Sequence, residues 1–499
     1  MERISRMDKK FYLNFFFVAL IYFLLRIFYP ETVEFGYDQP KTATLINQFL
    51  ERGTYLTSQN FTQVTIGGSI AWGPALIFFY APFLAITHNP LIVSYLILIF
   101  NILSVFFIFY VGWKFFSPSV GIIAGLFLAI NPWWIIFSRM IYQPTPVPFF
   151  IALSIFLFLN TVKNPKSFWF VLLLLSWGVL IQTYLITFSF IATSLLILII
   201  FFTKNKNDFS VKYLLFGLIL NTVIFLPSIF YYINNPDIFY KFITATHEYK
   251  TSVIMAIKSF VEILSGGGFE WQLGYGYEMF KKGFGGFETF LCLVKLLMVS
   301  ILVSGSIIAI RSKNIKKISI LLFVIAPIWA LPAIGVEHIV PRYFLYVLPS
   351  LSLFVGITIE HLVIRFSKLF YVFPIFLFIF WIFFIFKYFI FIISFNYPNG
   401  FLSNWSDVPY SYLDKSFKWM ANDSQKKGYN SFTVSSDLNH PKEFRFNEAQ
   451  RYYWGYILRK DENLTDKIGH YLMYFSSVSD KHNVDSVRFG PYVIINLSN

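Results

Sequence analysis

The stretch "FWFVLLLLSWGVLIQTYLITFSFIATSLLILIIFF", residues 168–202, carries no charged side chain and decides the fold. As one helix it would measure about 52 Å at 1.5 Å per residue, whereas about 20 residues suffice to cross a hydrocarbon core of about 30 Å. The stretch therefore predicts two membrane spans joined by a tight hairpin, with Gln182 and Thr183 at the turn.

The composition of the whole chain extends this interpretation. Of 499 residues, 57% are hydrophobic and 21% aromatic, only 13% are charged, and the mean hydropathy is +0.62. So little polar surface cannot cover a soluble core, which indicates a polytopic membrane protein. The single cysteine, Cys292, excludes a disulfide framework. The net charge of +14 does not indicate nucleic-acid binding, because its excess lies in short gaps between apolar runs.

Those basic gaps set the topology. Short loops rich in lysine and arginine face the cytoplasm, so the chain must cross the membrane an even number of times between two such gaps. The pattern predicts eleven spans, near residues 11–29, 91–113, 119–137, 146–162, 168–182, 184–203, 211–231, 289–310, 318–334, 343–363 and 369–394. The N-terminus is then cytoplasmic in the plasma membrane, and everything after the last span is extracytoplasmic.

Two domains follow from this topology. Residues 1–395 form an all-α polytopic membrane bundle with long outer loops at 30–90 and 232–288. Residues 396–499 form a small extracytoplasmic α/β domain. Their periodicity indicates helices near 414–428 and 447–460 and strands near 431–436 and 490–499.

The apolar stretch "AWGPALIFFYAPFLAIT", residues 71–87, competes with this count. It is short and contains Pro74 and Pro82, and a span here would place every later basic cluster outside. We therefore expect an outer juxtamembrane or re-entrant helix.

The residues that could take part in catalysis or binding are all expected on the outer face. Asp38 follows the first span, which is expected to be fully apolar, Arg139 lies at the second outer tip, and Arg342 follows Glu337 and His338 at the third. A carboxylate can take a proton from an incoming hydroxyl, and arginines bind phosphate through a planar fork. A phosphate leaving group needs no protonation, so a single acid can suffice. This combination favours sugar transfer from a polyprenyl-phosphate donor.

Four motifs carry a resemblance to a known family. They are "GYDQ" (36–39), "WGPALIFFYAPF" (72–83), "FSRMIYQP" (137–144) and "PRYFLYVLP" (341–349). In this order and on this face, they resemble the GT-C superfamily of polyprenyl-phosphate-sugar-dependent glycosyltransferases, in its protein O-mannosyltransferase and aminoarabinose-transferase branch. The resemblance covers roughly residues 1–365.

The resemblance implies roles for individual residues. Asp38 is the expected catalytic base of an inverting transfer, and Arg139 and Arg342 are the expected ligands of the donor phosphate. The remaining residues expected to bind substrate are Tyr37, Gln39, Lys41, Trp72, Tyr142, Gln143, His338 and Tyr343. Membrane lipid and a polyprenyl-phosphate-linked sugar are the expected partners, with an unidentified glycan, lipid or protein as acceptor. No cofactor or metal ligand is assigned, and a divalent metal ion is left open.

Alternatives stand beside these roles. Asp38 can simply cap the helix "QPKTATLINQFLERG", with Leu45, Ile46, Phe49 and Leu50 toward the bilayer and Gly53 ending it. Arg139 and Arg342 can be interfacial anchors that extend to lipid headgroups. The glycine-rich segment 265–286 can be a mobile lid or an inert loop.

Other functions also fit the composition. A lipid-linked sugar flippase or other transporter is one, although the span centres are nearly free of ionisable residues. A noncatalytic polysaccharide-assembly subunit of the same fold is the other.

Overall fold

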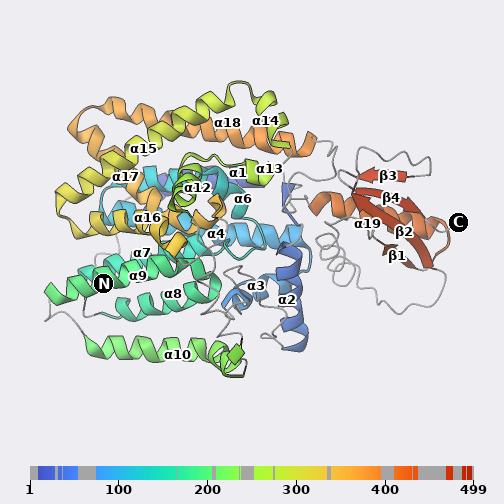
Figure 1. The fold of residues 1–499 in the computed structure, drawn as a ribbon, viewed down its shortest axis with the longest axis horizontal. Helices are drawn as coiled ribbons and strands as arrows, with labels where there is room; N and C mark the ends of the chain where they lie inside the picture. Colours follow the sequence, from blue (N-terminus) through green and yellow to red (C-terminus); the bar gives the residue numbers. More distant parts are fainter. Residues whose placement is uncertain are drawn as a thin grey trace.

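The computed structural model describes most of the chain. The described residues are 9–28, 32–35, 38–53, 75–165, 167–204, 210–234, 236–237, 252–273, 276–333, 339–394, 410–429, 431–435, 468–475, 486–489 and 492–496. They form a helical bundle with a small sheet-containing domain at one end (Figure 1). This confirms the expected fold class.

Long apolar helices make up the bundle and run side by side in Figure 1. They are α1 (Lys9–Ile27), α4 (Pro90–Phe115), α5 (Pro118–Ile130), α6 (Pro132–Phe137), α7 (Val147–Lys163), α8 (Trp169–Thr183), α9 (Phe188–Lys204), α10 (Val211–Asn234), α15 (Phe287–Ser312), α16 (Ile315–Ala333), α17 (Leu348–Arg365) and α18 (Val372–Ser394). Short 3₁₀ turns precede three of them: η2 (Leu185–Thr187), η5 (Pro341–Val347) and η6 (Lys368–Tyr371).

Eight segments of the described chain are long and apolar enough to cross a membrane, which makes this a multi-pass membrane protein. The three other expected spans correspond to the shorter apolar helices α5, α7 and α8. The hairpin expected within 168–202 is present, because α8 ends at Thr183 and α9 begins at Phe188. The span expected at 119–137 is broken at Asn131, where α5 ends and α6 begins.

Three of these helices begin with the same device. The side chains of Asn89, Ser117 and Asn131 each accept a backbone N–H in the first turn of the helix that follows. In each case a proline comes next, at the first helical position, where its missing N–H costs nothing. The helix starts are therefore set by local sequence.

Close backbone packing forms the centre of the bundle. A Cβ atom on Gly112 of α4 would lie 2.6 Å from the Cα atom of Gly121 in α5. A Cβ atom on Gly356 of α17 would lie 2.9 Å from the carbonyl oxygen of Val120. Small residues permit such approach between membrane helices, where dispersion and shape must replace the hydrophobic effect.

Two short helices lie across one end of the bundle. The helix α2 (Asp38–Arg52) crosses the ends of the long helices in Figure 1, beside α3 (Ala75–Ile86). The 12 residues of α3 would cover about 18 Å, less than a hydrocarbon core. Gly53 ends α2 with a φ of +66° and an N–H that donates to the Phe49 carbonyl.

The orientation expected for α2 is partly wrong. Ile46 is buried rather than turned to the bilayer, and Phe49 packs edge-on against Phe78 of α3. Leu50 is the exposed member of the set. The two short helices therefore bury an apolar seam between them.

The C-terminal domain packs α19 (Tyr410–Lys426) against a four-stranded sheet. The strands are β1 (Ser431–Ser435), β2 (Ile468–Phe475), β3 (Ser486–Phe489) and β4 (Tyr492–Asn496), in the order β1-β2-β4-β3. Strands β1 and β2 are parallel, and the other pairs are antiparallel. The expected helix near 447–460 lies outside the described residues, and β2 and β3 were not expected.

The start of α19 contacts the first outer loop. The Tyr410 N–H donates to the carbonyl of Val33 at 2.8 Å, and the Tyr410 ring meets Phe35 edge-on. The Tyr412 hydroxyl donates to the Ile393 carbonyl near the end of α18. The C-terminal domain is thus joined to the loop that leads to Asp38.

The membrane orientation predicts a labelling pattern. In a Cys292→Ala background, single cysteines at the exposed positions Glu51 and Lys415 should react with an impermeant maleimide in intact cells. One at Ser312 should react only after permeabilisation, because the basic gap around it is expected to face the cytoplasm. Labelling of Ser312→Cys with protection of Lys415→Cys would contradict the orientation. Labelling of Glu51→Cys with protection of Lys415→Cys would mean that an odd number of spans separates the two positions.

Candidate functional site

The centre of the candidate site is the turn between α6 and α7, here called the second tip (residues 138–146). Its backbone is not helical, yet it is largely buried. The Asn101 amide from α4 donates to the Ser138 carbonyl at 2.8 Å, and the Thr145 hydroxyl donates to the Phe137 carbonyl at 2.9 Å. Buried backbone groups need such partners, so these side chains determine the path of the tip.

The helix α3 holds the same tip through Tyr80. The buried Tyr80 hydroxyl lies 2.6 Å from the Tyr142 carbonyl and 3.3 Å from the Met140 carbonyl, and it accepts the Tyr142 N–H at 3.1 Å. One phenol thus serves three backbone groups of the turn. Figure 1 shows α3 beside α2 at the end of the bundle. Through Tyr80, α3 therefore helps to hold the second tip in place.

A buried arginine reaches the tip from α1. Arg26 was overlooked when the first span was expected to be fully apolar. Its side chain has no exposed surface, and its Nε donates to the Ser138 Oγ at 2.7 Å. The tip is therefore held by α1, α3 and α4 together.

Arg139 points into the protein. It is 3% exposed, its Nη1 donates to the Arg26 carbonyl at 3.4 Å, and its Nη2 donates to the Thr32 hydroxyl. Its guanidinium carbon lies 4.8 Å from the centre of the Phe389 ring. A buried arginine with protein neighbours on several sides is not a headgroup anchor, so that alternative fails for Arg139.

Arg342 lies in η5 and faces the other end of the second tip. Its guanidinium carbon is 5.9 Å from the centre of the Tyr142 ring and 5.8 Å from that of Tyr343. Arg342 and Tyr343 are half-buried, as is Gln143. The structure therefore brings Arg342 of η5 next to the second tip.

A tyrosine from the hairpin turn joins this group. Tyr184 is buried between α8 and η2. Its hydroxyl interacts electrostatically with Arg342, Tyr142 and Tyr343. Tyr184 therefore places one more phenol group near Arg342.

The first outer loop supplies the other expected residues. Asp38 begins α2, and Gln39 is buried while Lys41 is half-buried. The Thr32 contact of Arg139 brings this loop to the second tip. The side chain of Asp38 lies outside the described residues, and so do Tyr37, Trp72 and His338 in full.

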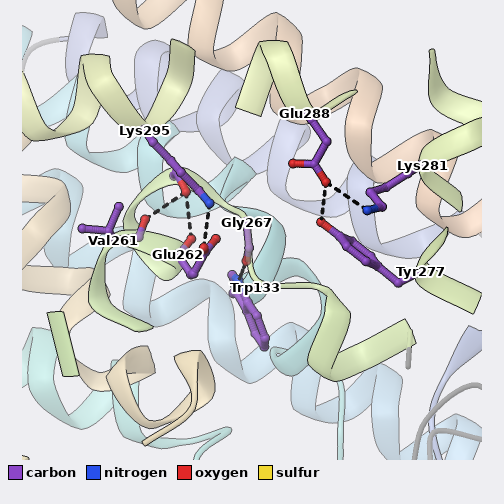
Figure 2. Close-up of polar contacts among 9 residues, drawn as sticks. Trp133, Val261, Glu262, Gly267, Tyr277, Lys281, Glu288 and Lys295 are labelled. Atoms are coloured by element: carbon purple, nitrogen blue, oxygen red, sulfur yellow. Dashed lines mark hydrogen bonds and ion pairs between the residues drawn. The ribbon is translucent and has the colours of Figure 1, made fainter. Parts of the chain in front are cut away.

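The glycine-rich segment is not a mobile lid over its first part. After α12 (Val253–Ser265) the chain turns inward, and the Gly267 carbonyl accepts the indole N–H of Trp133 at 2.6 Å (Figure 2). The Trp381 indole donates to the Ser265 carbonyl at 2.8 Å. Gly266 has a φ of +73° and ends α12. This turn is embedded between α6 and α18, so both the lid and the inert-loop interpretations are wrong for it.

The later part of the segment forms α13 (Glu270–Leu273) and α14 (Tyr277–Phe284). Figure 2 shows Lys281 of α14 directed at Glu288, which begins α15; their nitrogen and oxygen atoms are 3.4 Å apart. Phe280 and Phe284 of α14 are buried against α15 and α18. Residues 252–273 and 276–286, the larger described part of the expected long loop, are thus mostly helical and packed.

An ion pair ties α12 to α15. The Lys295 ammonium lies 2.6 Å from Oε1 of Glu262, and Figure 2 shows the two side chains meeting beside the glycine turn. Burial raises the pKa of Glu262, and Lys295 opposes that shift.

No metal centre is evident in the described part of the chain. It holds no group of three histidine, cysteine, aspartate or glutamate side chains that could bind an ion.

Arg26, Tyr80, Asn101 and Tyr184 were missed by the sequence analysis. Each lies within or beside an apolar helix, where a single polar residue barely changes the average hydropathy. The signal for Arg26 was its position, since a charge inside a span is a functional hypothesis in its own right.

This architecture is similar to that of solved structures of ArnT and of an archaeal oligosaccharyltransferase. The structure of ArnT from Cupriavidus metallidurans bound to undecaprenyl phosphate matches with a TM-score of 0.55 over 97% of both chains, at 11% identity. The Archaeoglobus fulgidus oligosaccharyltransferase in the apo form matches with a TM-score of 0.56 and 12% identity, over 94% of this chain and 70% of that one.

A third match is the A. fulgidus oligosaccharyltransferase AglB in complex with an inhibitory peptide and a dolichol-phosphate. Its TM-score is 0.53 at 12% identity, over 94% of this chain and 69% of that one. No family model and no protein of curated function matches the sequence. At these identities the similarity establishes the fold.

The glycine turn yields a stability prediction. Gly266→Ala should destabilise the protein by more than about 1 kcal/mol, because a left-handed conformation is costly for any residue with a Cβ atom. That atom would also lie 2.7 Å from the Trp381 indole nitrogen. Thermal unfolding of the detergent-purified protein measures the effect. The matched control is Gly283→Ala in α14, where the added Cβ would meet nothing within 4 Å. Equal melting temperatures for the two variants would contradict the packed turn.

Proposed function

We propose that this protein is an integral membrane glycosyltransferase that moves a sugar from a polyprenyl-phosphate-linked donor to an extracytoplasmic acceptor. The observation that carries the proposal is that the second tip links Arg139 to Thr32 of the loop before α2, and Tyr142 to Arg342 of η5, at one end of a GT-C-like bundle. The similarity to ArnT over nearly the whole chain supports it, since that protein is solved with undecaprenyl phosphate. AglB, solved with dolichol-phosphate, supports the same class of lipid carrier.

The reaction follows from the groups available. An acceptor hydroxyl oxygen attacks the anomeric carbon of the donor sugar, and the bond between that carbon and the phosphate oxygen breaks. Asp38 takes the hydroxyl proton, and the polyprenyl phosphate leaves with its charge held by Arg139 and Arg342. Base catalysis and charge stabilisation by guanidinium groups are the two contributions required of the protein. Tyr37, Tyr142 and Tyr343 supply ring faces for the sugar, and Gln39 supplies a neutral hydrogen-bonding group.

The remaining residues have accessory parts in this proposal. Lys41 adds positive charge near the start of α2, and Trp72, Gln143 and His338 bind substrate at the loop edges. The acceptor is a glycan, lipid or protein. A flippase would move the donor without cleaving it, and a noncatalytic subunit would bind without turnover, so transfer of labelled sugar separates all three.

Replacement of the proposed base tests the reaction. Asp38→Asn should lower transfer of radiolabelled sugar from a polyprenyl-phosphate donor to membrane extract by about 10²- to 10⁴-fold, the usual contribution of a general base. Donor affinity should stay nearly constant. Asn caps a helix about as well as Asp, so a residue that only caps α2 would give a silent Asp38→Asn and a destabilising Asp38→Ala. Full transferase activity in folded Asp38→Asn protein would remove Asp38 from the mechanism.

The arginines are tested by donor titration. Arg342→Ala should weaken donor binding by roughly 1.5–3 kcal/mol, the range for hydrogen bonds to a charged group. Arg342→Lys should recover only part of this, because lysine lacks the planar fork. Arg139→Lys should also bind the donor more weakly than the wild type. Arg365→Ala, at the exposed far end of α17, is the control and should bind normally. Unchanged titrations for both Arg342→Ala and Arg139→Lys would show that neither arginine holds the donor.

A further inference from the structure

Arg26 has an unusual set of contacts for a residue in the last turn of α1. Its Nε donates to the Ser138 Oγ at 2.7 Å, and its Nη1 donates to the carbonyls of Tyr22 at 3.0 Å and Ala129 at 2.7 Å. Its guanidinium carbon lies 3.9 Å from the centre of the Tyr22 ring. These contacts join α1 to the end of α5 and to the second tip.

The charge of Arg26 is not neutralised by a carboxylate in the described part of the chain. Its partners among the described residues are neutral oxygens and a ring, and its Nη2 is buried there without an acceptor. Burial of a cation costs several kcal/mol, and a hydrophobic side chain of similar volume often stabilises such a position better. Packing alone therefore does not account for an arginine here.

The contacts lead to Arg139. The side chain of Arg26 holds Ser138, while the backbone carbonyl of Arg26 accepts from Nη1 of Arg139. Asn101 fixes the Ser138 carbonyl from the other side. One residue of α1 thus contacts two consecutive residues of the tip, through its side chain and through its main chain.

We propose that Arg26 is a positioning residue for the donor phosphate. It fixes Ser138 so that the adjacent Arg139 keeps one orientation, and its uncompensated charge makes the tip more attractive to an anion. This inference rests on the proposed function, since it assigns Arg26 to the same phosphate site. Arg26 acts through Ser138 and Arg139 rather than by contact with the donor.

The test uses the full-length protein in detergent and farnesyl phosphate, a short polyprenyl phosphate without a sugar. Isothermal titration gives Kd, and thermal unfolding without ligand gives Tm. Arg26→Lys retains the charge but loses the fork, so its Kd should rise about tenfold, the lower end of the value of a hydrogen bond to a charged group. Arg26→Gln loses the charge as well and should bind more weakly still. Arg365→Lys is the matched control and should leave Kd unchanged.

Ser138→Ala provides a milder second variant if Arg26→Gln does not fold. It removes only the Oγ acceptor and should raise Kd a few-fold. In the Arg26→Lys/Ser138→Ala double variant the two effects should not add, because both remove one contact. A residue that only stabilises the fold would lower Tm and leave Kd and the double-variant coupling unaffected, and that result would overturn the inference. If the wild type does not bind farnesyl phosphate, the proposed donor class is also wrong. If the wild type binds and the Kd of the variants is unchanged, only the proposed role of Arg26 is wrong.

Discussion

A turn of non-helical backbone inside a membrane protein must find all its hydrogen bonds within the protein. Tyr80 from α3 and Asn101 from α4 bond to the backbone of the second tip, and Arg26 from α1 bonds to the Ser138 hydroxyl beside them. Because each partner is committed to a particular backbone or hydroxyl oxygen, the helices can approach the turn in few ways. The arrangement of the outer end of the bundle follows from this constraint.

The same constraint explains how residues far apart in the sequence form one site. The tip places Arg139 against Thr32 of the first loop at one end and Tyr142 against Arg342 of η5 at the other. Chemistry of the proposed kind requires positive charge that is held in place before substrate arrives, because preorganised dipoles and charges need no rearrangement in the transition state. A turn held from three sides provides that rigidity.

Helix breaks could be predicted from the sequence because membrane thickness and loop charge act on long runs of residues. The hairpin at Thr183 and the break between α6 and α7 fell where those rules put them. The roles of Arg26 and Tyr80 could not be predicted from the sequence. The role of a single polar side chain depends on its hydrogen-bond partner, and only the fold shows which partner that is. The turn at 265–268 was expected to be a mobile lid or an inert loop because it is rich in glycine. Glycine permits motion, but it equally permits other groups to pack close to the backbone. Here the indole groups of Trp133 and Trp381 hold it still.

The bond between the Tyr410 N–H and the Val33 carbonyl also orders events during synthesis. A ribosome delivers the first loop early and α19 only after all the membrane helices, and chains fold from the N-terminus as they emerge. Phe389 of α18, which covers Arg139, arrives equally late. The first loop and the arginine beside it therefore gain their final contacts only near the end of translation. A chain truncated before residue 389 would carry every residue of the proposed phosphate site but lack these two contacts.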